Sequence, residues 1–281
     1  MTSAPDRGRR TTKITDAQAH VWQRVVPGAT PHYEAPFTAE ALVSRMDEAG
    51  VQRAIIVPPS WADDGNEVAL AAADAHPDRL AVMGVAALDA PDAKQRLSRW
   101  RDRPGLLGLR QPFHVQPYIG WLDTRSLDWV WTVAAAAGMP VMVYPAGLVA
   151  KFERIAREFP DLRLVVDHMG LPLDTSPVRR LEAVHELVRL SRYPNVAVKL
   201  SALPLYSHEA FPFRDVHDSV CRVLEAFGPH RSFWGSDLTR LSCSYGDAVA
   251  MMGLIDGLSE SERELVMGEA VSAWLGWLGH R

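Results

Sequence analysis

The stretch LRLVVDHM at residues 162–169 is an apolar, β-rich run that ends in an aspartate and a histidine. Runs of the same kind recur along the chain, and the segments between them repeat apolar residues near every 3.6 positions, as helices do. The other runs are residues 14–22 (ITDAQAHVW), 52–58 (QRAIIVP), 80–88 (LAVMGVAAL), 105–113 (GLLGLRQPF), 140–146 (PVMVYPA), 195–202 (NVAVKLSA) and 232–238 (SFWGSDL). This alternation predicts an α/β fold whose parallel sheet closes into a (β/α)8 TIM barrel.

The length and composition of the chain suit one large domain. It has 281 residues, of which 47% are hydrophobic, and a (β/α)8 barrel of about 250 residues is commonly a single unit. No internal repeat or composition break marks a second domain. We therefore expect residues 13–281 to form one barrel domain, preceded by a disordered N-terminal tail at residues 1–12.

Charge and hydropathy argue against nucleic-acid and membrane partners. The net charge is −4, and no basic stripe is interleaved with aromatic residues. No run of about 18 apolar residues could span a membrane, and no apolar export segment follows the polar tail. The two cysteines, Cys221 and Cys243, are too few for a disulfide framework and suit a reducing compartment, so we expect a cytoplasmic protein.

Polar residues at the carboxyl ends of TIM-barrel strands face the active site, because the side chains lower in the barrel are packed. This rule selects a set of candidate site residues: His20, Ser60, Arg110, Tyr144, Asp167, His168, Lys199, Ser201 and Asp237. Ionisable groups inside apolar runs need partners or a chemical task, since an unpaired buried charge is costly. Strand alternation places Asp167 on the opposite face from His168 and predicts a structural role for it.

Structural roles are open for several of these residues. Asp237 could cap the helix that follows it, and Arg110 and Lys199 could be ion-pair partners inside the barrel. His32 falls in a loop, where we expect it to be solvated. Residues 204–215 are expected to form a long βα loop of the kind that covers substrates.

Six segments follow, in order, the motifs of a known family. They are DAQAHVW (16–22), IIVPPSWADDGN (55–66), GLRQPF (108–113), FPDLRLVVDHMGLP (159–172), NVAVKLSAL (195–203) and GPHRSFWGSDLTR (228–240). Together they resemble the amidohydrolase-2 family of the amidohydrolase superfamily, and among its branches the one with 2-pyrone-4,6-dicarboxylate lactonase and sugar lactonases. The resemblance implies a TIM barrel from about residue 15 to the final helix, and a monomer or homodimer.

The resemblance also bears on a metal cofactor. Relatives usually carry H-x-H in the first strand, which can hold zinc together with a later histidine and an aspartate. Here residues 18–20 read Q-A-H, and the amide oxygen of Gln18 is a poor zinc ligand. We therefore expect no metal cofactor; if zinc or another divalent ion is bound, its ligands would be His20, His168 and Asp237.

The reaction that the resemblance implies is hydrolysis of a lactone. Asp237 would act as general base for water, while His20, His168 and the amide of Gln18 would donate hydrogen bonds to the developing oxyanion. The substrate would be a small anionic molecule, because relatives grip carboxylates with basic and hydroxyl side chains from these loops. The substrate-binding candidates are Arg110, Tyr144, Lys199, Ser60, Arg240 and Trp61.

Two other reactions remain open. Another branch of the family decarboxylates aromatic or unsaturated acids with an intact metal site, so a bound divalent ion would favour that reaction. A diverged barrel could instead catalyse a non-hydrolytic biosynthetic step such as isomerisation, dehydration or cyclisation. The replacement at Gln18, the Leu-Thr-Arg sequence at 238–240 and the Gly-Glu-Ala sequence at 268–270 keep this alternative open.

Overall fold

Eight parallel strands form a barrel, and their order in the sheet is their order in the sequence. The structure is a computed structural model that describes residues 13–29, 32, 35–62, 65–173 and 175–277, so the expected tail at residues 1–12 lies outside the described residues. The strands are β1 (Thr15–Ala19), β2 (Arg53–Ile56), β3 (Leu80–Gly84), β4 (Leu106–Gln111), β5 (Val141–Val143), β6 (Leu164–Val166), β7 (Val196–Ser201) and β8 (Ser232–Gly235). The predicted TIM barrel is confirmed.

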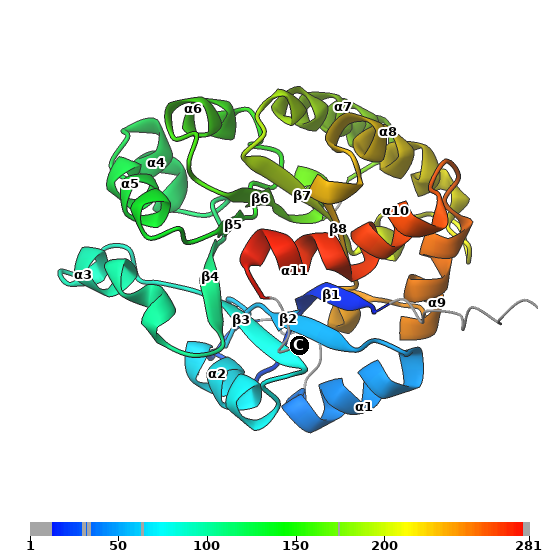
Figure 1. The fold of residues 1–281 in the computed structure, drawn as a ribbon, viewed down its shortest axis with the longest axis horizontal. Helices are drawn as coiled ribbons and strands as arrows, with labels where there is room; N and C mark the ends of the chain where they lie inside the picture. Colours follow the sequence, from blue (N-terminus) through cyan, green and yellow to red (C-terminus); the bar gives the residue numbers. More distant parts are fainter. Residues whose placement is uncertain (1–12, 30–31, 33–34, 63–64, 174, 278–281) are drawn as a thin grey trace, which may run out of the picture.

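Helices surround the strands as an outer ring (Figure 1). They are α1 (Ala39–Ala49), α2 (Gly65–Ala75), α3 (Ala93–Ser98), α4 (Tyr118–Asp123), α5 (Asp128–Ala136), α6 (Lys151–Glu158), α7 (Pro177–Val188), α8 (His217–Phe227), α9 (Tyr245–Ala250), α10 (Glu260–Glu264) and α11 (Ala270–Leu275). Local chemistry sets their ends: Thr38 accepts a hydrogen bond from the backbone N–H of Ala41 at the start of α1, and Gly50 ends that helix in the left-handed conformation. In the part of the chain that is described, no helix is long and apolar enough to cross a membrane.

Two apolar cores hold the barrel together. One lies between the strands and the outer helices. The other fills the barrel interior and is formed by alternate strand residues together with α11: Ala17, Ile55, Val57, Ala81, Met83, Leu107, Met142, Val165, Ala197, Phe233, Ala270, Val271 and Leu275. Figure 1 shows α11 (red) crossing the end of the barrel that faces the viewer. Because α11 closes this end of the barrel, the polar residues at the carboxyl ends of the strands meet at the opposite end.

The seam between β8 and β1 is closed largely by a side chain. Asp16 is fully buried, and its carboxylate accepts hydrogen bonds from the backbone N–H of Ser236 at 2.8 Å and from the Tyr245 hydroxyl at 2.6 Å. One backbone bond runs from Asp237 N–H to the carbonyl of Gln18 at 2.9 Å. These bonds tie the start of the loop after β8 directly to β1.

Gly268 allows the chain to pack against the base of β1. A Cβ atom at this position would lie 2.5 Å from the carbonyl oxygen of Lys13 and 2.7 Å from the nitrogen of Thr15, closer than any side chain can approach. The Gly-Glu-Ala sequence at 268–270 therefore has a packing reason.

The segment at 204–215 forms an irregular βα loop, as expected from the sequence. Its ends are 3-10 turns at Leu203–Tyr206 and Arg214–Val216. The buried guanidinium of Arg180 joins both ends, because it donates to the carbonyl oxygens of Tyr206 and Asp215, each at 2.5 Å.

Candidate active site

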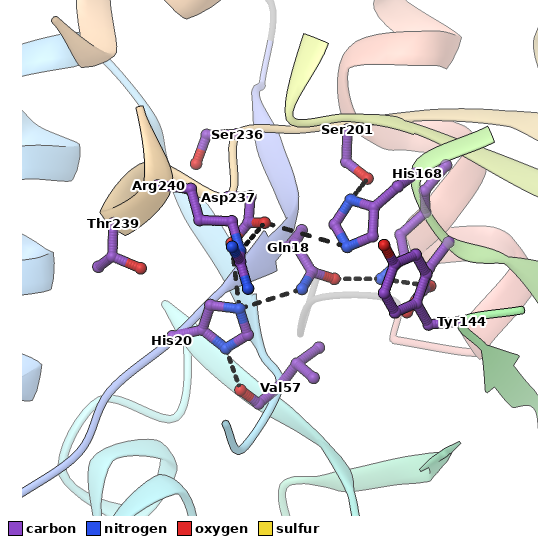
Figure 2. Close-up of polar contacts among 12 residues, drawn as sticks. Gln18, His20, Val57, Tyr144, His168, Ser201, Ser236, Asp237, Thr239 and Arg240 are labelled. Carbon is purple, nitrogen blue, oxygen red and sulfur yellow. Dashed lines mark hydrogen bonds and ion pairs between the residues drawn. The ribbon is translucent and has the colours of Figure 1, made fainter. Parts of the chain in front are cut away.

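Side chains from the carboxyl ends of several strands converge on Asp237 (Figure 2). His20 follows β1, His168 follows β6, and Gln18 lies within β1. His20 and His168 approach the carboxylate of Asp237 directly, whereas Gln18 reaches it through His20. The structure therefore brings the four predicted catalytic residues together.

Asp237 lies at the centre of the site and is 1% exposed. Its Oδ1 is 3.0 Å from His20 Nε2, and its Oδ2 is 3.4 Å from Arg240 Nε and 4.0 Å from His168 Nε2. Its side chain makes no capping bond to the turn Leu238–Arg240 that follows. Apart from these ion-pair contacts, neither carboxylate oxygen accepts a hydrogen bond from the residues that the structure describes. A buried carboxylate is thus left with unused acceptor capacity.

Nearby charges control the ionisation of Asp237. Burial raises the pKa of its carboxyl group, but the contact with His20 and the charge of Arg240 outweigh burial and hold that pKa well below its usual value. The carboxylate is therefore ionised at neutral pH. An ionised, desolvated carboxylate can accept a proton from a water molecule within hydrogen-bond reach.

His168 is placed as a neutral hydrogen-bond donor. Its Nδ1 lies 2.9 Å from the Ser201 hydroxyl, and its Nε2 faces Asp237. Burial lowers the pKa of His168 to about 4, although Asp237 and Asp167 act in the opposite direction. Because Nε2 faces a carboxylate, the neutral ring carries its proton there, and the Ser201 hydroxyl donates to Nδ1.

A second network fixes Gln18 and His20. The ammonium group of Lys199 donates to Gln18 Oε1 at 2.5 Å, and the amide Nε2 of Gln18 lies 3.3 Å from His20 Nε2. His20 Nδ1 lies 2.6 Å from the carbonyl oxygen of Val57. The amide of Gln18 is therefore directed at the imidazole beside Asp237 (Figure 2).

Asp167 binds two cations inside the barrel. Its Oδ1 is 2.7 Å from Lys199 Nζ, and its Oδ2 is 3.0 Å from Arg110 Nε. Burial raises the pKa of Asp167, but these two cations outweigh burial and hold it below its usual value. The expectation that Asp167 faces away from His168 was wrong, because strand geometry ends at Val166 and His168 adopts a left-handed φ of 52°. Arg110 and Lys199 are thus ion-pair partners, the structural alternative that the sequence left open.

The loops after β1 and β2 place aromatic rings beside His20. The Trp61 ring lies 5.7 Å from the His20 ring, and His32 lies 5.6 Å from His20 and 4.0 Å from Trp61. His32 Nδ1 is 2.6 Å from the Thr239 hydroxyl, and burial, followed by the charge of His20, lowers the pKa of His32 to about 3. Sequence reasoning missed His32 and expected it to be solvated; nothing in its local pattern distinguishes it from a surface loop residue.

The remaining substrate-binding candidates differ in their availability. Arg240 is 28% exposed at its side chain beside Asp237, whereas Arg110 is buried and lies over the Tyr144 ring at 5.8 Å. The Tyr144 hydroxyl donates to the carbonyl oxygen of Leu171 at 3.1 Å, and burial raises its pKa to about 12. Ser60 is exposed in the turn before Trp61 and lies outside the contacts described above.

The site lacks one of the zinc ligands that the resemblance implies, since Gln18 stands at the position of the first histidine. Among the described residues, no group of three or more His, Cys, Asp or Glu side chains is arranged to hold a metal ion. At the position where relatives carry the first histidine, the Gln18 oxygen is turned toward Lys199 rather than toward Asp237. His20, His168 and the carboxylate of Asp237 remain as candidate ligands, and three protein ligands with water in the fourth position are the set that a catalytic zinc ion uses.

Comparison with known proteins identifies the family. A family model described as Amidohydrolase matches residues 15–275. An L-fucono-1,5-lactonase of Burkholderia ambifaria is 30% identical over 249 residues, which cover 83% of this chain and 83% of that protein. Among solved structures, a zinc-bound amidohydrolase of Burkholderia multivorans has a TM-score of 0.81 at 22% identity, covering 94% of this chain and 99% of its own. A candidate 2-pyrone-4,6-dicarboxylic acid hydrolase of Pseudomonas putida has a TM-score of 0.75 at 21% identity, covering 95% and 98%.

These two structural matches share the barrel fold with the chain. The family match covers the strands and the site residues at their ends, which are also the positions of the six sequence motifs. The chain belongs to the amidohydrolase family.

Proposed function

We propose that this protein hydrolyses a small anionic lactone, with Asp237 as general base for water and without a metal ion. The observation that carries the proposal is the buried carboxylate of Asp237, which is ionised and has unused acceptor capacity beside His168 and Arg240. The relative at 30% identity, an L-fucono-1,5-lactonase, supports the reaction class.

Each step of the hydrolysis has a group in the site. Asp237 accepts a proton from water while the water oxygen attacks the carbonyl carbon of the lactone. The N–H at His168 Nε2 and the guanidinium of Arg240 stabilise the negative charge that develops on the carbonyl oxygen. When the tetrahedral adduct collapses, the ring C–O bond breaks, and the proton on Asp237 passes to the departing alkoxide. The product is a hydroxy acid.

The charges around the site favour an anionic substrate. Arg240 offers a partly exposed guanidinium, and guanidinium binds carboxylates through paired hydrogen bonds. His32 Nε2 and Trp61 Nε1 are buried and make no hydrogen bond with the described residues. We assign them to polar groups of the substrate, on the side of His20 formed by the β1 and β2 loops.

The test combines metal analysis with turnover. Protein purified without a metal-affinity step is assayed for metal content and for hydrolysis of L-fucono-1,5-lactone and 2-pyrone-4,6-dicarboxylate, with and without chelator. We expect metal well below stoichiometry and turnover that the chelator does not change. Stoichiometric zinc with chelator-sensitive turnover would overturn the metal-free reaction, and no hydrolysis of either compound would overturn the reaction class.

A further inference from the structure

One buried carboxylate bonds both ends of the segment 236–245, which follows β8. Asp16 of β1 is fully buried, and its Oδ1 accepts hydrogen bonds from the backbone N–H groups of Ser236 at 2.8 Å and Gln18 at 2.9 Å. Its Oδ2 accepts hydrogen bonds from the hydroxyl groups of Ser236 and Tyr245, the latter at 2.6 Å. Ser236 directly follows β8, whereas Tyr245 begins α9. The same side chain therefore holds the start and the end of this segment.

Three residues of the candidate site lie between these two ends (Figure 2). Asp237 is the proposed base, and Arg240 Nε lies 3.4 Å from its Oδ2. The hydroxyl group of Thr239 is 2.6 Å from Nδ1 of His32, which we assign to the substrate. The backbone N–H of Asp237 also donates to the carbonyl oxygen of Gln18 at 2.9 Å. The position of the base relative to β1 thus depends on how the segment is held.

Asp16 has no acceptor capacity left for chemistry of its own. A carboxylate has about four lone-pair sites, and two N–H and two O–H donors fill them. We infer that Asp16 is a positioning residue that holds the segment 236–245 at both ends and so fixes the base and the substrate-binding groups of this segment relative to β1. The inference rests on the proposed function. Positioning matters because a displacement of about 1 Å can lower a rate about 100-fold.

The two hydroxyl groups on Asp16 Oδ2 allow each end of the segment to be released separately. Ser236→Ala removes the bond beside the base and frees the backbone N–H of Leu238, which donates to the Ser236 hydroxyl at 2.9 Å. With L-fucono-1,5-lactone as probe, we expect this variant to lower kcat about 10-fold with KM nearly unchanged. Tyr245→Phe releases the other end. We expect it to raise KM about 3- to 10-fold, because Thr239, the partner of His32, lies on that side of the base.

A matched control separates positioning from general stability. Tyr193→Phe removes a bond of the same kind outside the candidate site, between the Tyr193 hydroxyl and Glu153 Oε1 at 3.2 Å, and should change neither kcat nor KM. A loss of folded protein alone would lower the apparent kcat without raising KM. The inference would be overturned if kcat of Ser236→Ala, or KM of Tyr245→Phe, equalled that of Tyr193→Phe.

A second measurement needs no substrate. Hydrogen–deuterium exchange followed by mass spectrometry should show faster exchange across 236–245 in Tyr245→Phe than in the unaltered protein, and no such difference in Tyr193→Phe. Unchanged exchange across this segment would overturn the inference even if the lactone is hydrolysed. Full activity of Asp237→Asn would overturn the proposed function instead, so the two failures are distinguishable.

Discussion

At the scale of single residues, left-handed backbone conformations place the two candidate catalytic groups, His168 and Asp237. His168 and Asp237 both have left-handed φ angles, 52° and 53°, directly after their strands. Such conformations cost about 1–3 kcal/mol for residues other than glycine and persist only where surrounding contacts hold them. Ser201 and the seam bond to Gln18 supply those contacts. The turn from strand to left-handed residue aims each side chain across the barrel mouth.

Substitution of His32 tests the loop residue that the sequence did not reveal. His32→Phe keeps a ring against Trp61 but removes the nitrogen assigned to the substrate. We expect KM for a hydrolysed lactone to rise about 3- to 10-fold with kcat nearly unchanged. This is the effect of losing one hydrogen bond that is made equally in the ground state and in the transition state. Steady-state kinetics checks this, with Thr239→Val as the variant that removes only the partner of Nδ1. A fall in kcat without a change in KM would contradict the assignment.

Residues at strand ends were predictable, and loop residues were not. The rule that strand ends face the site found His20, His168 and Asp237, because barrel geometry fixes where each strand finishes. His32 lies in a loop after β1, where no periodicity indicates which way a side chain points. The alternation that separates Asp167 from His168 fails at His168, which leaves the strand pattern with a left-handed φ of 52°.

At the scale of elements, one ion network joins four strands beneath the site. Arg110 comes from β4, Asp167 follows β6, Lys199 belongs to β7, and its ammonium also binds Gln18 of β1. Breaking a buried pair leaves a charge without a partner, whereas an exposed pair contributes little. The network therefore supports both the barrel and the orientation of Gln18.

Substitution of Lys199 by methionine tests whether the buried ion network stabilises the protein more than an exposed ion pair does. We expect it to lower the free energy of unfolding by about 3–5 kcal/mol, because Asp167 loses its nearer partner in a buried site. The matched control is Lys151→Met, whose ion pair with Asp123 has side chains 31% and 57% exposed, and which should cost less than about 1 kcal/mol. Urea denaturation measures both. Equal losses of unfolding free energy in the two variants would show that the buried network stabilises the protein no more than an exposed ion pair does.

Element boundaries were less predictable than element order. The apolar run at 80–88 contains β3, but the strand ends at Gly84, because apolar loop residues after a strand continue the same hydrophobic pattern. Barrel closure was also beyond the periodicity of the sequence. It depends on Asp16, whose carboxylate accepts hydrogen bonds from Ser236 and Tyr245, more than two hundred positions away in the chain.

At the scale of the whole molecule, neutral buried histidines make stability depend on pH. His168 has a folded pKa of about 4 against an ordinary value of 6.5, and that of His32 is about 3. Between these values the unfolded chain binds protons that the folded chain does not, so stability should fall as the pH is lowered from about 6.5 to about 4. The lowered pKa of Asp237 affects stability only at pH values below about 4, where an unfolded aspartate begins to bind a proton.

Urea denaturation at pH 7 and pH 4.5 measures this dependence. A His168→Gln variant should lose less stability between the two pH values than the unaltered protein does. His185→Gln is the control, because His185 is exposed on α7 and its removal should leave the dependence unchanged. The same dependence in all three proteins would contradict a neutral, buried His168.

The most direct test of the account is the rate of lactone hydrolysis by Asp237→Asn relative to the unaltered protein, with both treated with chelator. The asparagine has the same shape but cannot accept a proton from water, so the account predicts that kcat falls by about 10²- to 10⁴-fold. Circular dichroism and the melting temperature confirm that the variant is folded. If folded Asp237→Asn hydrolyses the lactone at a rate comparable to that of the unaltered protein, Asp237 is not the base, and the proposed reaction is contradicted.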